Sequence, residues 1–337
     1  MKLIEINKRK HILSYTLHTI LMDGRSRGIL IYEIANLYMG SQLPHLNYQY
    51  KDYAVWQHSL MKNDLMKNQE KYWLSQFDGE LPSLEFPYDK PRPQEATYQG
   101  ELFYIILEDR IYSSLKMLAK ENSTTLFSIL LSAYATLLSK YADKRDIVIG
   151  TVVEGRFNED LESLIGMFLN TLALRIKLPH NTTYFQFLMD VKRNLIKAYQ
   201  NQDYPFDDLV DNLKVKRKGN QSPLFDVMFV MHHNYQYDFQ LKFDDLEFSP
   251  YNPKNNSYHA RFDLTLDILE HDDKCILNLY YNTSLLNTET SEEILNHYVY
   301  ILEQIIADPH INIDKLFDTR PAEKSEFDKK LEFDFDF

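Results

Sequence analysis

The sequence predicts a mixed α/β protein folded as two lobes, and three observations support this prediction. Segments with the alternating apolar pattern of strands and segments with helical apolar spacing follow one another along the chain. The chain has 337 residues, more than the roughly 100–200 that one hydrophobic core usually serves. A stretch with four prolines, 81–94, interrupts both patterns and is typical of a linker. We therefore expect the two lobes to meet at this linker.

Before the linker, the pattern predicts two short strands, at 2–5 and 11–17, followed by three helices. The first helix should follow the turn signal Asp23-Gly24, with Ser26 available as its cap. The other two helices are expected at 50–58 and 65–77.

After the linker, strands and helices continue in alternation. The nearly continuous apolar run at 224–231 indicates a strand that is buried on both faces. The other predicted strands lie at 101–107, 146–153, 167–176, 239–248, 261–270 and 274–282, and the helices at 110–120, 126–141, 185–200, 205–213 and 291–306. We divide the chain into a first-lobe segment at 1–95, a second lobe at 96–317 and a charged tail at 318–337 that is expected to fray.

Composition excludes several classes of function. The formal net charge is −12, and the sequence shows no basic face of the kind that binds nucleic acid. A single cysteine, Cys275, builds neither a disulfide framework nor a zinc cluster and fits a reducing cytoplasm. The longest apolar helical stretch, 126–138, is too short to span a membrane. Phosphate loops, HExxH, CxxC and GxSxG motifs are absent, so we expect neither a bound cofactor nor a metal.

Five sequence blocks carry the functional signal. They are HTILMDG at 18–24, YKDYAVWQ at 50–57, IGTVVEGR at 149–156 with its continuation LESLIGMFLNTL at 161–172, NQDYPF at 201–206 and SPLFDVMFV at 222–230. Each block alone is weak, because an Asp-Gly after a strand is also a good turn. Together, in this order and spacing, they resemble the motifs of condensation domains from nonribosomal peptide synthetases, and the linker resembles the inter-lobe connection of that family.

This resemblance implies a fold similar to chloramphenicol acetyltransferase, in which two related lobes form a V around a tunnel. It also implies the reaction, which joins two aminoacyl or peptidyl thioesters into an amide. The implied partners are donor and acceptor peptidyl carrier proteins, which deliver the substrates on phosphopantetheine arms, and the neighbouring synthetase domains.

The resemblance assigns a site made of His18, Thr19, Asp23, Gly24 and Arg156. His18 matches a histidine that is largely structural in the family. A histidine on a strand is also most often a core residue, so both interpretations predict a structural role. Asp23 is expected to pair with Arg156 across the lobes, although a turn or cap role for the aspartate and a surface position for the arginine stay open. Gly24 matches the glycine that keeps the tunnel open, or it serves a turn with positive φ.

The sequence departs from the family at several positions. Thr19 replaces the second histidine of the motif, which the family uses as a base or hydrogen-bond partner of the attacking amine. A threonine hydroxyl does not accept a proton appreciably at neutral pH. Glu154 stands where the family usually has alanine, and His232 and His233 stand where it tends to have Gln-Asn. Only residues 1–17 precede the motif, so we expect an incomplete first lobe and a complete second lobe.

Three functional readings follow for the chain. The first is a condensation domain segment whose amide formation is impaired by Thr19 and by truncation, so that its status as an enzyme stays open. The second is a non-catalytic module that keeps the fold and binds carrier proteins or partner enzymes. The third is a gene fragment without a stable fold.

Overall fold

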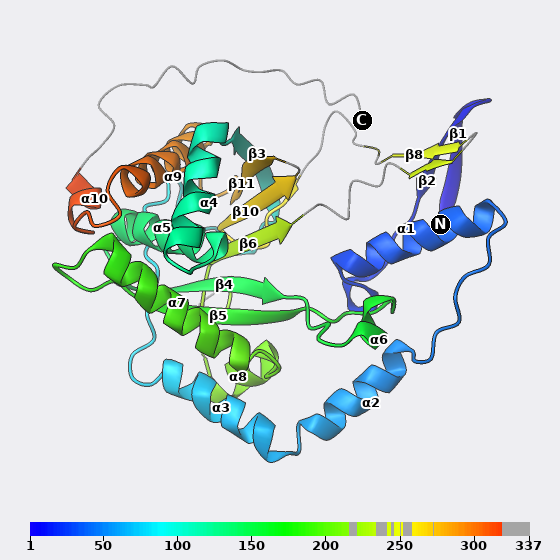
Figure 1. The fold of residues 1–337 in the computed structure, drawn as a ribbon, viewed down its shortest axis with the longest axis horizontal. Coiled ribbons are helices and arrows are strands. Elements are labelled where there is room, and N and C mark those ends of the chain that lie inside the picture. Colours follow the sequence, from blue (N-terminus) through cyan, green and yellow to red (C-terminus); the bar gives the residue numbers. More distant parts are fainter. Residues whose placement is uncertain are drawn as a thin grey trace.

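The computed structural model describes residues 1–215, 221–233, 241–243, 246–249, 251, 258–271 and 273–318. Figure 1 shows a main body, in which helices cover a twisted sheet, and an arm that projects from it. The arm consists of residues 1–60. The predicted tail lies outside the described part of the chain from residue 319 onward, and the expectation that the first lobe is incomplete stays a prediction.

The arm begins with a β-hairpin and continues into helices. Strands β1 and β2 pair antiparallel, with Lys2 opposite Ser14. The bounds of the elements up to the linker are β1 (Lys2–Asn7), β2 (Lys10–Ser14), the 3₁₀ helix η1 (Thr19–Leu21), α1 (Gly24–Tyr38), α2 (Tyr50–Leu60) and α3 (Asp64–Gln76). Helix α3 packs on the main body beside α8. Both predicted strands and all three predicted helices are therefore confirmed.

The main body contains a seven-stranded sheet with the order β5-β4-β6-β10-β11-β3-β9. Strands β4, β6 and β10 are parallel neighbours, and the other pairings are antiparallel. The bounds are β3 (Gln99–Ile106), β4 (Asp146–Val153), β5 (Asn170–Lys177), β6 (Val227–His233), β9 (Tyr258–His259), β10 (Leu264–His271) and β11 (Lys274–Asn282). Residues 227–229 of β6 are buried, as expected for a central strand.

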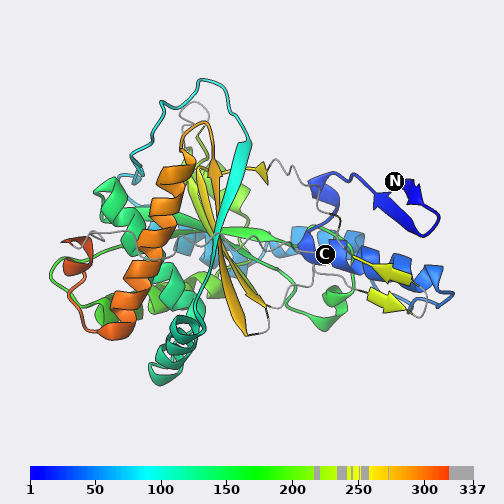
Figure 2. The same cartoon turned by 90° about the horizontal axis from the view of Figure 1, so that it is seen from above.

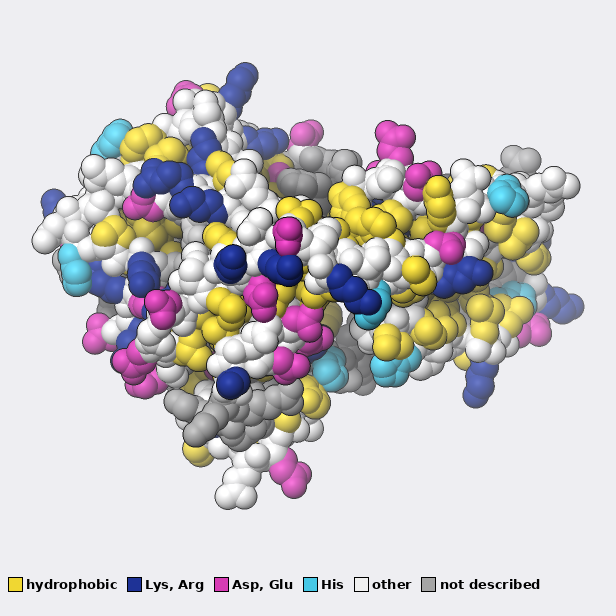
Figure 3. All heavy atoms as spheres, turned by 90° about the horizontal axis from the view of Figure 1, so that it is seen from below, with side chains coloured by type: hydrophobic (Ala, Val, Ile, Leu, Met, Phe, Trp, Pro, Cys, Tyr) yellow, Lys and Arg dark blue, Asp and Glu magenta, His cyan; other side chains and the backbone are white. Residues whose placement is uncertain are grey.

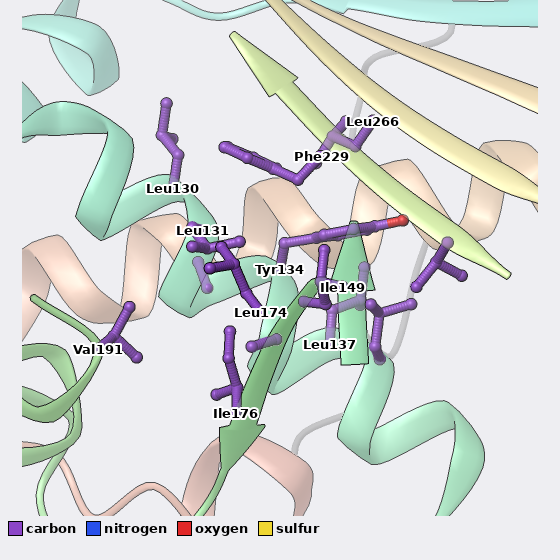
Figure 4. Packing of buried hydrophobic residues seen from close by; sticks show 14 of the residues in the cluster. Leu130, Leu131, Tyr134, Leu137, Ile149, Leu174, Ile176, Val191, Phe229 and Leu266 are labelled. Carbon is purple, nitrogen blue, oxygen red and sulfur yellow. The ribbon is translucent and has the colours of Figure 1, made fainter. Parts of the chain in front are cut away.

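Helices cover one side of this sheet, and Figure 2 shows α9 and α4 on that side and the arm on the other. The bounds of the helices after the linker are α4 (Asp109–Glu121), α5 (Leu126–Ala142), α6 (Glu159–Glu162), α7 (Tyr184–Gln200), α8 (Phe206–Leu213), α9 (Thr288–Ala307) and α10 (Lys315–Asp318), and Figure 1 places α6 beside the arm. Helix α5 is apolar nearly all round and is buried between its neighbours. Figure 4 shows its Leu131 and Tyr134 packed against Ile149 of β4 and Phe229 of β6.

Some predicted elements differ from the structure. The stretch 239–248, predicted as one strand, instead holds two short strands that pair antiparallel, β7 (Leu241–Phe243) and β8 (Leu246–Phe248). Figures 1 and 2 both place this hairpin beside the arm, and it forms no part of the seven-stranded sheet. Helices η1 and α6 were not predicted, because three or four residues are too few to show an apolar period.

The predicted linker is irregular and is anchored to the main body. The Arg92 guanidinium and the Tyr88 hydroxyl both donate to the carboxylate of Asp263, just before β10. Asp263 is 5% exposed, and its amide donates to the carbonyl oxygen of Asp226 just before β6. Burial, followed by the negative charge of Asp263, raises the pKa of the Asp226 carboxyl to about 6.

This raised pKa predicts a pH-dependent stability that Asp226→Asn removes. A carboxyl whose pKa is higher in the folded state stabilises the fold fully below its ordinary pKa, and that contribution is lost as pH rises through about 6. One pKa unit corresponds to about 1.4 kcal/mol, so the loss is on the order of 2–3 kcal/mol. Urea unfolding at pH 4.5 and 7.5 should show the variant gaining stability relative to the unmodified chain at the higher pH. An equal difference at both pH values would contradict the prediction.

Candidate functional site

Asp23 fixes the start of α1 and the arm's contact with the main body. It is the N-cap of the helix, and its Oδ1 accepts a hydrogen bond of 2.8 Å from the Ser26 amide. Its Oδ2 accepts from the amide of Phe168 at 3.2 Å, and its own amide donates to the carbonyl oxygen of Gly166 at 3.0 Å. The cap is therefore Asp23 and not Ser26, as the sequence had suggested. The carboxylate accepts hydrogen bonds from two parts of the chain that lie far apart in sequence.

Arg156 lies in the loop after β4 and forms the predicted ion pair with Asp23. Its Nη2 lies 3.1 Å from each carboxylate oxygen. The two side chains are 1% and 2% exposed, and the guanidinium stacks on the Phe168 ring at 4.0 Å from the ring centre. Its Nη1 donates to the backbone oxygens of Leu161 and Leu164. The alternative cap role of Asp23 is confirmed together with the ion pair, and the surface position for Arg156 is wrong.

Ser26 is a central residue of the site that sequence reasoning did not assign to it. The side chain is fully buried. Its hydroxyl donates to the Gly166 oxygen at 2.8 Å and accepts from the Gly166 amide at 3.0 Å and from Arg156 Nη2 at 2.8 Å. Its position three residues after an Asp cap is the only sequence signal, because its partners lie 130 and 140 residues away.

Aromatic rings close the junction on its other side. Tyr50 of α2 donates from its hydroxyl to the Met167 oxygen at 2.8 Å and meets the Phe168 ring edge-on. A Cβ at Gly166 would lie 2.0 Å from the Tyr50 ring, so only glycine fits there. Tyr53 is buried in the same cluster, and burial raises the pKa of its hydroxyl to about 12. Tyr50 and Tyr53 of the second sequence block thus serve packing at this junction.

His18, Thr19 and Gly24 lie at the exposed end of this junction. His18 is the N-cap of η1, and its Nδ1 accepts from the Ile20 amide at 3.2 Å. The His18 and Thr19 side chains are both exposed, so the expectation of a core histidine on a strand is wrong. Gly24 is the first residue of α1 and has no positive φ, which corrects the turn reading of that glycine. The structure therefore brings Asp23, Gly24 and Arg156 together and leaves Thr19 on an open turn beside them.

Glu154 and His232, which also depart from the family motif, both lie near side chains of opposite charge type. Glu154 lies 3.5 Å from Arg25 of α1, which also reaches Glu162 at 3.3 Å. His232 at the end of β6 lies near Asp267 of β10, with 3.6 Å between Nε2 and Oδ1. The side chain of His233 lies outside the described part of the chain.

Two further classes of site find no support in the described residues. Among them, no cluster of three or more histidine, cysteine and carboxylate side chains has the arrangement of a metal site. None of the helices in this part of the chain combines the length and the apolar character needed to cross a bilayer.

Comparison with known sequences identifies the family. The profile of the condensation domain family matches residues 1–327. Gramicidin S synthase 2 of Brevibacillus brevis is 40% identical over 314 residues, which are 93% of this chain and 7% of that protein. Tyrocidine synthase 3 of Brevibacillus parabrevis is 40% identical over 316 residues, 94% of this chain and 5% of that protein. The chain spans less than a tenth of the length of these curated relatives.

Solved structures show the same fold. The X-domain from teicoplanin biosynthesis has a TM-score of 0.83 at 22% identity, covering 93% of this chain and 73% of that one. The first condensation domain of the CDA synthetase has a TM-score of 0.67 at 16% identity, covering 89% of this chain and 64% of that one. The fold is therefore of the chloramphenicol acetyltransferase-like class. Within this class, the chain belongs to the condensation domain family of nonribosomal peptide synthetases.

The buried ion pair predicts a large effect of Arg156→Ala on the attachment of the arm. Removing one partner of a buried pair leaves an uncompensated charge and costs about 3–5 kcal/mol. Hydrogen exchange of the α1 amides, measured by mass spectrometry, should become at least about a hundredfold faster. Arg25→Gln is the matched control, because its partners Glu154 and Glu162 are more than half exposed and such pairs contribute about 0–1 kcal/mol. Equal exchange rates in the two variants would show that the buried pair does not hold the arm.

Proposed function

We propose that this chain acts in amide formation between two carrier-bound thioesters. The observation that carries the proposal is the buried Asp23–Arg156 pair beneath the turn of His18 and Thr19, in a chain of the condensation domain family. The acceptor amine attacks the thioester carbonyl of the donor, and the thiol of the donor arm leaves. The role of the pair in this reaction is to hold the turn against the main body, because neither charged group is exposed to a substrate.

The proposed partners follow from this reaction. Donor and acceptor peptidyl carrier proteins bring the two thioesters on phosphopantetheine arms, and neighbouring synthetase domains position the carriers. The chain supplies no cofactor of its own, since the thioester already activates the acyl group. Synthetases of this kind are expected in the cytoplasm, where carriers and activated amino acids are made.

Thr19 lowers the rate that we expect from the site. A general base contributes typically 10²–10⁴-fold to a reaction that transfers a proton, and the threonine hydroxyl cannot take this role. Orientation of the two tethered reactants contributes more, up to about 7–11 kcal/mol. Without another proton acceptor, the reaction is therefore weak rather than impossible.

A second function is favoured by one specific observation. The X-domain of teicoplanin biosynthesis, solved in complex with the protein OxyB, has a TM-score of 0.84 with this chain. A condensation-like fold can thus present a surface to a partner enzyme. In this alternative, the chain is a non-catalytic module that binds carrier proteins or a partner enzyme. The loss of a general base at Thr19 then has no effect on function.

A single-turnover assay with a loaded donor and a loaded acceptor carrier tests the proposal. We expect slow formation of the dipeptidyl carrier by the unmodified chain, detected by intact-protein mass spectrometry over hours. Thr19→His alone should not bring the rate to a useful level, because residue 19 lies on an exposed turn and orientation is the larger contribution.

Two outcomes would overturn parts of this proposal. Product at the no-enzyme level from both proteins, together with measurable binding of either carrier, would support the non-catalytic module instead. A gain of a hundredfold or more in Thr19→His would show that the missing base, and not the orientation of the reactants, limits the rate.

A further inference from the structure

Two titratable side chains lie together on the face of the sheet that the helices leave uncovered. Strands β6 and β10 are parallel neighbours, with Val230 opposite Asp267 and His232 opposite Leu269. Because side chains alternate between faces along a strand, His232, Val230 and Asp267 project from the same face. His232 Nε2 lies 3.6 Å from Asp267 Oδ1.

This face is the one turned toward the arm. In β10, residues Leu264, Leu266 and Ile268 are buried in the core beneath the helices, so Asp267 between them projects from the opposite face. Figure 2 shows the arm on that side of the sheet. The histidine and aspartate therefore look away from the hydrophobic core and toward the part of the molecule that carries Thr19.

The His232–Asp267 pair also lies near the edge of the sheet from which the loop carrying Arg156 leaves. Strands β4, β6 and β10 are parallel, so their carboxyl ends meet at one edge, and Figure 1 shows their arrowheads directed toward the arm. The chain leaving β4 reaches Arg156 within three residues, and β6 ends at His233. The edge that bears His232 is thus the edge from which Arg156 contacts the start of α1.

Asp267 is a largely buried carboxyl that lies next to His232. Its side chain is 14% exposed, and among the described residues no hydrogen bond reaches its Oδ1. Burial raises the pKa of this carboxyl, and the charge of His232 counteracts the rise. A buried carboxylate without sufficient hydrogen bonds is costly, and the imidazolium that forms when His232 accepts a proton offsets that cost. At 3.6 Å the carboxylate attracts the imidazole without a hydrogen bond, and we infer that this attraction orients the ring.

We propose that His232, oriented by Asp267, is the proton acceptor that replaces the second histidine of the family motif. The inference rests on the proposed function. As the new C–N bond forms, the imidazole takes a proton from the attacking nitrogen. When the C–S bond breaks, the imidazolium returns this proton to the departing sulfur, so the products are an amide and a thiol without net proton change. Because Nε2 is the ring nitrogen that lies 3.6 Å from Asp267 Oδ1, we expect the neutral ring to keep its proton on Nε2.

The single-turnover assay of the full chain tests the proposal with isosteric variants. His232→Gln should lower the rate of dipeptidyl carrier formation at least about a hundredfold, as expected for loss of a general base. Asp267→Asn should lower it about tenfold or more, because the ring loses its orienting carboxylate. His180→Gln is the control, since His180 is exposed after β5 at the opposite edge of the sheet, and its rate should not change.

A second measurement separates this inference from the proposed function. Two-bond ¹H–¹⁵N spectra of the ¹⁵N-histidine-labelled chain, assigned with His232→Gln, report which ring nitrogen carries the proton. We expect an Nε2–H tautomer for neutral His232 and loss of this preference in Asp267→Asn. An Nδ1–H tautomer in the unmodified chain, or an unchanged rate in His232→Gln, overturns the inference alone. Absence of product from every protein overturns the proposed function and the catalytic role of the pair together.

Discussion

The ion pair between Asp23 and Arg156 is the constraint on which the position of the arm depends. A buried pair contributes little net stability, because desolvation offsets most of the Coulomb attraction. Its value lies in geometry, since each carboxylate oxygen and each guanidinium amino group has a fixed partner. Ser26 and Gly166 extend this network through three further hydrogen bonds. The turn with Thr19 is thereby fixed relative to the end of β4, whatever the arm itself contributes to stability.

Sequence reasoning predicted the helices and strands whose apolar residues repeat with a regular period. It failed for features that depend on contacts between residues far apart in the sequence. Helix α5 and strand β6 followed from their apolar patterns, because α5 is buried nearly all round and residues 227–229 of β6 are buried. The ion pair was predicted from motif resemblance and not from spacing, since 133 residues separate its partners. Ser26 was mistaken for a cap because its real partner, Gly166, lies in another segment. The hairpin of β7 and β8 was predicted as one strand because both strands share the same alternating pattern.

Two departures from the family motif change where imidazole groups lie. Thr19 removes an imidazole from the turn before α1, and His232 adds one at the end of β6. Within the described part of the chain, Asp267 Oδ1 is buried and accepts no hydrogen bond, and the added imidazole lies 3.6 Å from it. The same region of the molecule thus keeps an imidazole, carried by a strand of the sheet instead of by the turn before α1.

The exposed apolar surface of the arm bears on the rate of the proposed reaction. Many large apolar side chains are exposed there, including Leu3, Ile4, Ile20 and Leu21, and Figure 3 shows hydrophobic side chains spread over the arm. Exposed apolar surface of this extent is typical of interaction sites. The turn that carries Thr19 belongs to this surface, so a protein surface that covers the arm would also enclose the turn and exclude water from it. In the proposed reaction, orientation of the two thioesters is the larger contribution to the rate, and we expect it to depend on contacts at the arm, whereas the proposed proton acceptor, His232, belongs to the main body.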